Sequence, residues 1–221
     1  MQLKAENISR RYFRKHGEAN YFEAVRQVSL TLESGKLTVL NGKSGSGKTT
    51  LLNMLAGLLN PSEGKVFLDE TDLYALEDKA LSRMRNEKIG VIPQGRSAVD
   101  TLSVYENILL PGMLYGRTLR TEEAENWMEV FGISDLRNAM PAELSGGELR
   151  RMAIARTLTA SPEVILADEP TGDLDNDNTI VVLTALQQAA KAGKTVLVVS
   201  HETDAEAYAD RIYHMNHGMI E

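Results

Sequence analysis

Residues 42–50 combine glycines, lysines and hydroxyl side chains in one short stretch: Gly42, Lys43, Ser44, Gly45, Ser46, Gly47, Lys48, Thr49 and Thr50. Glycines leave backbone N–H groups free to surround an anion, and a helix beginning at Lys48 would aim its positive end at the same point. Lys48 can contact the β- and γ-phosphates of a nucleotide, and the Thr49 hydroxyl can ligate Mg²⁺. A chance match in a turn is the alternative. The apolar residues before this glycine-rich loop and the helical spacing after it favour a nucleotide-binding P-loop.

Two carboxylates follow an apolar run at residues 164–167. Asp168 would lie at the carboxyl end of a strand, where open parallel sheets bind ligands, and could hold Mg²⁺ through water. Glu169 could orient or deprotonate a water molecule that attacks a phosphate. Taken alone, the pair could equally be an acidic loop after a buried strand. Together with the glycine-rich loop, a catalytic role is the better interpretation.

A second glycine-containing stretch, the signature segment, covers residues 144–148, Leu144, Ser145, Gly146, Gly147 and Glu148. Its serine and glycines would open a helix running to Leu158, which again aims a helix N-terminus at an anion. A plain N-cap serine followed by flexible glycines is the alternative. The signature segment has no obvious ligand within its own subunit.

The elements that must position these residues alternate between strand and helix patterns. Strands are expected at residues 8–13, 28–32, 37–40, 66–68, 89–92, 164–167 and 195–199. Helices are expected from Lys48 to a stop within residues 57–64, and at residues 104–114, 122–131, 147–158 and about 178–192, with Pro111-Gly112 as a separator. This alternation predicts an α/β fold with a mainly parallel sheet covered on both faces.

The strand pattern almost disappears between residues 96 and 160. We therefore expect one domain over residues 1–221, in which residues 1–95 and 161–221 form the nucleotide-binding α/β core. Residues 96–160 would be an inserted helical subdomain that carries the signature segment.

Composition excludes several classes of protein. The chain has 221 residues, a net charge of −7 and no cysteine, which rules out disulfides and thiolate metal sites. Negative charge disfavours binding to nucleic acid, and the basic cluster at residues 10–15 is better explained as a solvated loop beside the nucleotide. No apolar run approaches the ~18 residues that cross a bilayer. We expect a chain that is soluble by itself and reaches a membrane only through a partner.

The signature segment resembles that of the ABC-type ATPases, and the remaining motifs of that family follow in order along essentially the whole chain. The resemblance implies that Ser145 and Gly147 contact the γ-phosphate of ATP held by the opposite subunit, with Gly146 also among the ATP-binding residues. It assigns Gln94 to Mg²⁺ sensing near a transmembrane partner, Asp175 to the subunit interface and His201 to the γ-phosphate. Tyr12 matches the aromatic platform for adenine, with Phe13, Tyr21 and Phe22 as competitors.

The resemblance also implies a fold and an activity. The fold is a P-loop NTPase of ABC ATPase type with an N-terminal antiparallel β portion. The activity is ATP hydrolysis by a head-to-tail homodimer, with Glu169, His201 and Lys48 as catalytic residues and Mg²⁺ held by Thr49, Gln94 and Asp168. His214 and His217 are expected to flank a terminal turn and not to bind a metal.

Residues 106–111 and 167–175 are similar to the branch that contains lipoprotein-release and macrolide-export ATPases. Leu149-Arg150 departs from the commoner glutamine-rich continuation of the signature. The branch implies a separate permease at the cytoplasmic face of the membrane and export or membrane extraction of a peptide, lipoprotein or drug. A cell-division-type ABC ATPase that regulates a membrane partner stays open. A nucleic-acid ABC ATPase lacks its usual coiled-coil insertion here, and a small-molecule kinase would leave the signature segment without a purpose.

Overall fold

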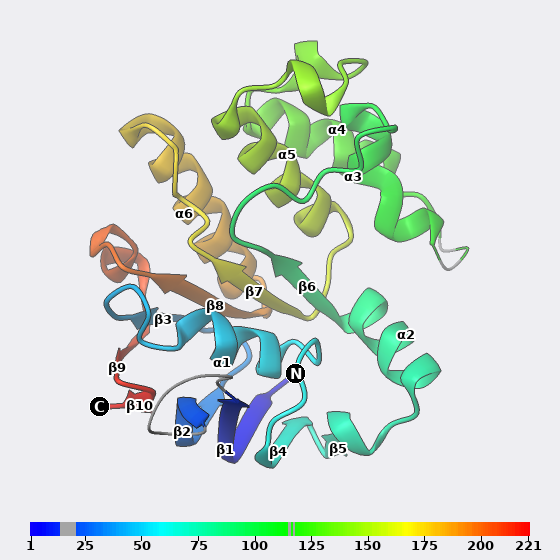
Figure 1. Ribbon diagram of the computed structural model, residues 1–221. Helices are drawn as coiled ribbons and strands as arrows, with labels where there is room; N and C mark the ends of the chain where they lie inside the picture. Colours follow the sequence, from blue (N-terminus) through cyan, green and yellow to red (C-terminus); the bar gives the residue numbers. More distant parts are fainter. Residues whose placement is uncertain (14–20, 115, 117) are drawn as a thin grey trace.

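The fold consists of two β-sheets with helices between and around them (Figure 1). It is seen in a computed structural model that describes residues 1–13, 21–114, 116 and 118–221. The strands are β1 (Leu3–Phe13), β2 (Tyr21–Leu32), β3 (Leu37–Asn41), β4 (Glu63–Leu68), β5 (Thr71–Asp72), β6 (Ile89–Ile92), β7 (Val164–Asp168), β8 (Thr195–Ser200), β9 (Arg211–Asn216) and β10 (Met219–Ile220). The α-helices are α1 (Lys48–Leu55), α2 (Asp78–Lys88), α3 (Val104–Met113), α4 (Thr121–Val130), α5 (Gly146–Thr159) and α6 (Asn176–Lys191).

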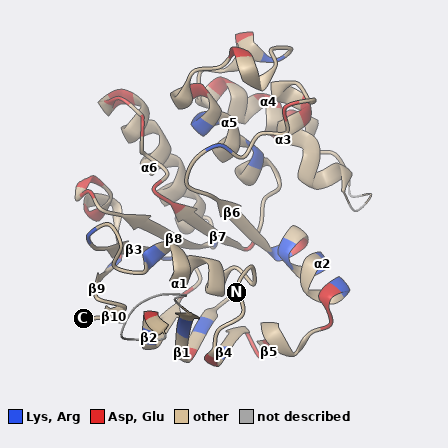
Figure 2. Ribbon diagram, viewed as in Figure 1, with Lys and Arg blue, Asp and Glu red and all other residues tan. Residues whose placement is uncertain are grey.

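The larger sheet has the strand order β10-β9-β3-β8-β7-β6, and all its pairs are parallel except β9 with β10. Its central strands β3, β7 and β8 carry no charged residue before Asp168 (Figure 2). Both faces of these strands are buried, which is typical of parallel strands covered by helices on each side. The predicted mainly parallel sheet is therefore confirmed.

Alternate side chains of these strands enter two separate hydrophobic clusters, because successive residues of a strand point to opposite faces. Val196 and Val198 of β8 join the helix-side cluster, which contains buried residues of α3, α4, α5 and α6. Leu197 and Val199 join the loop-side cluster, which contains α1 and the inner face of the smaller sheet. The glycine-rich loop leads into α1, whereas the signature segment leads into α5.

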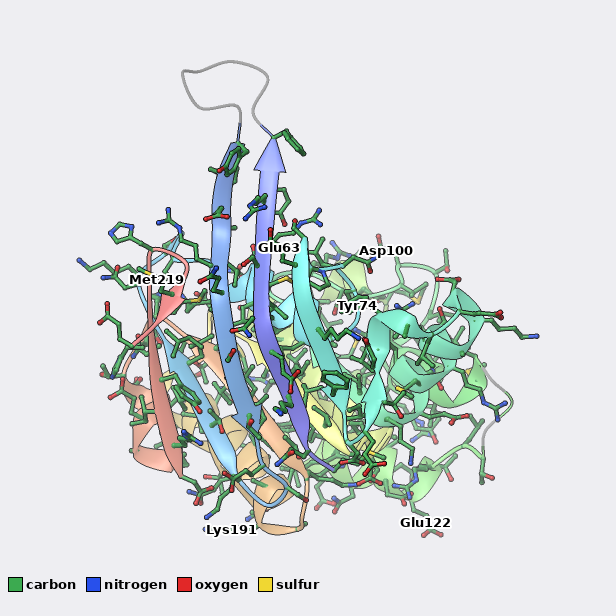
Figure 3. The ribbon with its side chains drawn as sticks, turned by 90° about the horizontal axis from the view of Figure 1, so that it is seen from below. Glu63, Tyr74, Asp100, Glu122, Lys191 and Met219 are labelled. Atoms are coloured by element: carbon green, nitrogen blue, oxygen red, sulfur yellow. The ribbon has the colours of Figure 1, made fainter. Side chains whose placement is uncertain are left out.

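The smaller sheet is antiparallel, with the strand order β2-β1-β4-β5. Viewed from below, β2, β1 and β4 lie side by side, and Met219 of β10 lies beyond β2 (Figure 3). β1 and β2 are longer than the strands expected at residues 8–13 and 28–32. Their pairing shifts register at several points between Ala5 and Arg11.

Several elements differ from expectation. α2, β5, β9 and β10 were not predicted, and Pro111-Gly112 lies inside α3 instead of ending it. The helix after the glycine-rich loop ends at Leu55, and Gly57, the first residue of the expected stop, turns the chain with φ 69°. The helical insert between β6 and β7 is present as expected and comprises α3, α4 and α5.

Among the described residues, no helix has the length and apolar character that a bilayer span requires. Arg14 and Lys15 of the basic cluster lie outside the described residues.

Candidate functional site

The glycine-rich loop connects β3 to α1 and is packed closely by two other strands. Gly47 has φ 107°, and a Cβ atom there would collide with the carbonyl oxygen of Ala24 in β2. A Cβ atom at Gly42 would collide with the carbonyl oxygen of Met215 in β9. Glycine is therefore required at these positions for close approach of neighbouring backbone, in addition to freeing N–H groups for an anion.

Lys48 places its ammonium group inside the curve of the loop. Nζ donates to the carbonyl oxygens of Gly42 at 2.5 Å and Lys43 at 3.0 Å, and the residue is 6% exposed. Burial lowers the pKa of Lys48, and the negative charges of Glu169 and Asp168 oppose that change. A buried cation with nearby acceptors on its own loop is well placed to meet an incoming phosphate.

Asp168 ends β7 beside the start of α1, with 3% of its surface exposed. Burial raises its pKa, while a hydrogen bond with the Thr49 side chain lowers it. Within the described part of the chain, Asp168 Oδ1 is buried without a hydrogen-bond partner. An unpartnered carboxylate oxygen beside a hydroxyl suits a hard cation such as Mg²⁺, which binds oxygen ligands.

The backbone turns at Glu169 in the left-handed conformation. Its φ of 48° lies in the left-handed region, which costs a non-glycine residue about 1–3 kcal/mol and commonly accompanies function. Its N–H donates to the carbonyl of Val199 at 2.8 Å. The turn holds the carboxylate between two other predicted residues: Gln94 Nε2 donates to Oε2 at 3.0 Å, and His201 Nδ1 lies 2.8 Å from Oε1.

Several of the predicted site residues line one cavity of about 680 Å³. Its lining includes Ser44, Gly45, Ser46, Gly47, Lys48, Thr49, Thr50, Gln94 and Glu169 from the predicted site. The aromatic residues Tyr12, Phe13 and Phe22 line the same cavity, whereas Tyr21 lines a separate groove beside β10. The structure thus narrows the candidate adenine platforms from four residues to three.

Tyr12 and Phe22 face each other across the β1–β2 pair. Their rings stack with centroids 5.4 Å apart and an interplanar angle of 23°. The guanidinium carbon of Arg10 lies 5.0 Å from the Tyr12 ring centre. Stacked aromatic rings in the lining of the cavity offer an apolar surface for a nucleotide base, and Tyr12 stays our prediction for that contact.

Ser145 and the signature glycines begin α5, as predicted. Ser145 is the N-cap residue, and Glu148 completes a capping box by accepting from the Ser145 backbone N–H at 2.7 Å. Ser145 also hydrogen bonds to the Glu148 side chain, which lowers the pKa of that carboxyl. Ser145, Gly146 and Gly147 are not among the residues that line the cavity.

Asp175 is the N-cap of α6. It accepts from the backbone N–H of Asn178 at 2.8 Å and also from the Asn178 side chain, and these bonds lower its pKa. Helix capping accounts for an aspartate at this position. Its role at a subunit interface stays a prediction.

Sequence reasoning missed two features of the site. The turn at His217 and Gly218 lines the same cavity and donates from Gly218 N–H to the Ser46 carbonyl at 2.9 Å. Arg150 is buried beside the carboxylates and donates to the Pro93 carbonyl at 2.7 Å. The turn at His217 was expected, but its place in the cavity was not, because β9 and β10 were not predicted. Arg150 had a sequence signal, since it departs from the usual signature.

Known proteins share this arrangement over most of the chain. A profile described as "ABC transporter" matches residues 25–172. The lipoprotein-releasing system ATP-binding protein LolD of Leptospira interrogans is 38% identical over 200 residues, which are 90% of this chain and 84% of LolD. The macrolide export ATP-binding/permease protein MacB of Campylobacter jejuni is 38% identical over 198 residues, but the match covers only 31% of MacB against 89% of this chain.

A solved structure agrees with these relatives. The ATP-binding cassette MJ0796, described as dimeric, in a post-hydrolysis state and bound to ADP and Pi, superimposes with a TM-score of 0.92. It is 33% identical in sequence, and the match covers 99% of this chain and 96% of MJ0796. The family profile, the relatives and the fold lead to one conclusion: the chain belongs to the ABC transporter family and is an ATP-hydrolysing ATP-binding cassette.

Proposed function

We propose that two copies of this chain close head to tail, so that each ATP lies between the glycine-rich loop of one copy and the signature segment of the other. The observation that carries this proposal is the division of the site. The cavity contains the glycine-rich loop, Gln94 and Glu169, while the helix N-terminus at Gly146 and Gly147 begins elsewhere, in the helical insert. A second copy would bring that positive helix end to the γ-phosphate. The MJ0796 cassette is described as dimeric, which supports the dimer but leaves its head-to-tail orientation as our proposal.

Within each composite site, Lys48 would neutralise the β- and γ-phosphates. Thr49 and Asp168 would hold Mg²⁺ with Gln94 nearby, because the Asp168 carboxylate has a buried oxygen to offer. The metal would supply positive charge to the phosphate oxygens. Tyr12 would stack on adenine at the aromatic part of the cavity lining.

Glu169 would act on the attacking water. It accepts the proton as the water oxygen bonds to the γ-phosphorus, and the bond to the bridging oxygen breaks to release ADP. Gln94 and His201 each engage one oxygen of this carboxylate and would hold it in place for the water. From these positions Gln94 would also lie near the metal, and His201 near the γ-phosphate.

The closed dimer would drive a separate transmembrane permease at the cytoplasmic face of the membrane. We infer that residues 96–160 form a subdomain which carries this movement, because α3, α4 and α5 share the helix-side cluster. LolD is named as an ATP-binding protein and is matched over most of its length, and MacB is named for macrolide export. These names favour export or membrane extraction of a peptide, lipoprotein or drug.

Mixing two inactive variants tests the composite site. Lys48→Ala removes the phosphate contact but keeps the signature segment, whereas Ser145→Arg blocks the signature segment but keeps the glycine-rich loop. Each variant alone should lack ATPase activity, and their mixture should recover it, because a mixed dimer contains one complete site. Both variants must show the far-ultraviolet circular dichroism of the unaltered chain. If the well-folded mixture stays inactive, the head-to-tail arrangement is wrong.

A trapped dimer supplies the second measurement. Glu169→Gln should bind ATP without hydrolysing it and elute as a dimer in MgATP but as a monomer without nucleotide. Glu169→Gln with Ser145→Arg is the matched control and should stay monomeric in MgATP. A Glu169→Gln chain that stays monomeric at saturating ATP would contradict the proposal.

A further inference from the structure

Arg150 lies in the second turn of α5, close behind the signature segment, and its side chain reaches two loops at once. The residue is 7% exposed, and Nη1 donates to the carbonyl oxygen of Pro93 at 2.7 Å. On the other side, Nη2 lies 3.9 Å from the position that a Cβ atom on Gly172 would occupy. One buried guanidinium group therefore binds the loop after β6 and lies beside the loop after β7.

Both loops hold Glu169. Pro93 immediately precedes Gln94, which donates to Glu169 Oε2 at 3.0 Å. Gly172 donates from its backbone N–H to the Glu169 carbonyl at 3.2 Å. A short chain of contacts thus leads from α5 through Arg150 to the two segments that fix the carboxylate and backbone of Glu169.

Burying the positive charge of Arg150 at this position costs free energy. Burial lowers the pKa of its guanidinium, and the carboxylates of Asp173, Asp168 and Glu169 oppose that change through space, without a direct ion pair among the described residues. An apolar side chain of similar length could fill the same volume without this desolvation cost. Stability alone therefore gives a poor account of an arginine at this position.

We propose that Arg150 is a positioning residue that couples the signature end of α5 to Glu169 of the same subunit. This inference rests on the proposed function, in which α5 receives the γ-phosphate of the partner's ATP. Movement of α5 on that contact shifts the Arg150 guanidinium, and the peptide of Pro93 and Gln94 moves with it. ATP bound to one subunit thereby adjusts the catalytic carboxylate of the subunit that offers the signature.

Arg156 provides a matched control on the same helix. It donates to the carbonyl of Ser97 at 2.9 Å and to its hydroxyl at 2.7 Å, so it also ties α5 to the loop after β6. Burial lowers the pKa of Arg156 too. Its contact lies three residues beyond Gln94, so it anchors the loop without adjoining the residue that holds Glu169.

The test compares Arg150→Met and Arg150→Lys with Arg156→Met and Arg156→Lys. We measure melting temperature, binding of a fluorescent ATP analogue, and kcat and KM for phosphate release. Both Met variants should lower the melting temperature similarly and leave nucleotide affinity unchanged. Arg150→Met should lower kcat about tenfold or more because Glu169 is misplaced, and Arg156→Met should not. Arg150→Lys should restore part of kcat, since an ammonium group still donates to the Pro93 carbonyl.

A double variant checks the route of the coupling. Arg150→Met combined with Gln94→Ala should lower kcat no further than the more damaging single change, because both act through the same hold on Glu169. Equal losses of kcat at Arg150 and Arg156, a loss confined to KM, or multiplying effects in the double variant would each overturn the proposal. If Arg150→Met does not fold, the two Lys variants give the same comparison. The mixture of Lys48→Ala and Ser145→Arg distinguishes the two possible failures. If the mixture recovers activity but the Arg150 variants behave like the Arg156 variants, the proposed function stands and only this inference fails.

Discussion

Adding a methyl group at Gly47 tests why the glycine-rich loop needs its glycines. Gly47 has φ 107°, and placing alanine in such a conformation costs about 1–3 kcal/mol. The new Cβ would also collide with the Ala24 carbonyl and lie 3.1 Å from the Met215 side chain, and such overpacking costs about 1–3 kcal/mol more. Gly47→Ala should therefore lower the free energy of unfolding by about 2–6 kcal/mol.

Gly45 offers a control in the same loop. Its φ is 77°, but nothing lies within 4 Å of an added Cβ, so Gly45→Ala carries only the backbone cost of about 1–3 kcal/mol. In a chain of this size each kcal/mol lowers the melting temperature by about 2–4 °C. Urea unfolding and thermal melts of both variants without nucleotide give the comparison. Equal destabilisation by the two substitutions would refute the reasoning, because the collision at Gly47 would then contribute nothing.

Further predictions concern the rest of the site. His201→Ala should lower kcat about 10²-fold with KM nearly unchanged, measured by steady-state phosphate release, because Glu169 loses one partner; an unchanged kcat would exclude His201 from the reaction. Asp168→Asn should raise the Mg²⁺ concentration for half-maximal ATPase activity about tenfold or more, whereas equal Mg²⁺ dependence would remove Asp168 from the metal site. Tyr12→Ala should weaken ATP binding in calorimetry by about 1–3 kcal/mol. Tyr21→Ala should leave that affinity unchanged, and the reverse result would reassign the adenine platform.

The sequence was sufficient for the elements whose residues are buried in a regular pattern. β7 was predicted because it is an unbroken apolar run followed by carboxylates, and α5 because its cap and apolar spacing coincide. α2 was missed because it buries only Leu81 and is otherwise rich in charge. β9 was missed for a similar reason, since Met215 is its one fully buried residue.

The residues of the candidate site also fall into those that the sequence identified and those that it did not. The glycine-rich loop, Asp168 and Glu169 are local motifs, so spacing alone identified them. Gln94 and His201 depended on the family resemblance, and the structure brings both to Glu169. The contact of Arg150 with the Pro93 carbonyl joins residues 57 positions apart. No local pattern encodes such a contact, because it depends on where α5 docks against the loop after β6.

The two hydrophobic clusters on opposite faces of β8 have a consequence for damaged forms of the protein. The glycine-rich loop depends on the loop-side cluster, while α5 depends on the helix-side cluster. A substitution such as Met152→Ala loosens only the helix-side cluster, so the chain could still take up ATP while its signature end is poorly formed. In a cell that also makes the intact chain, such a variant would occupy partners without completing their sites. Damage on that side of the sheet should therefore behave as dominant-negative, and equivalent damage around α1 as a simple loss of function.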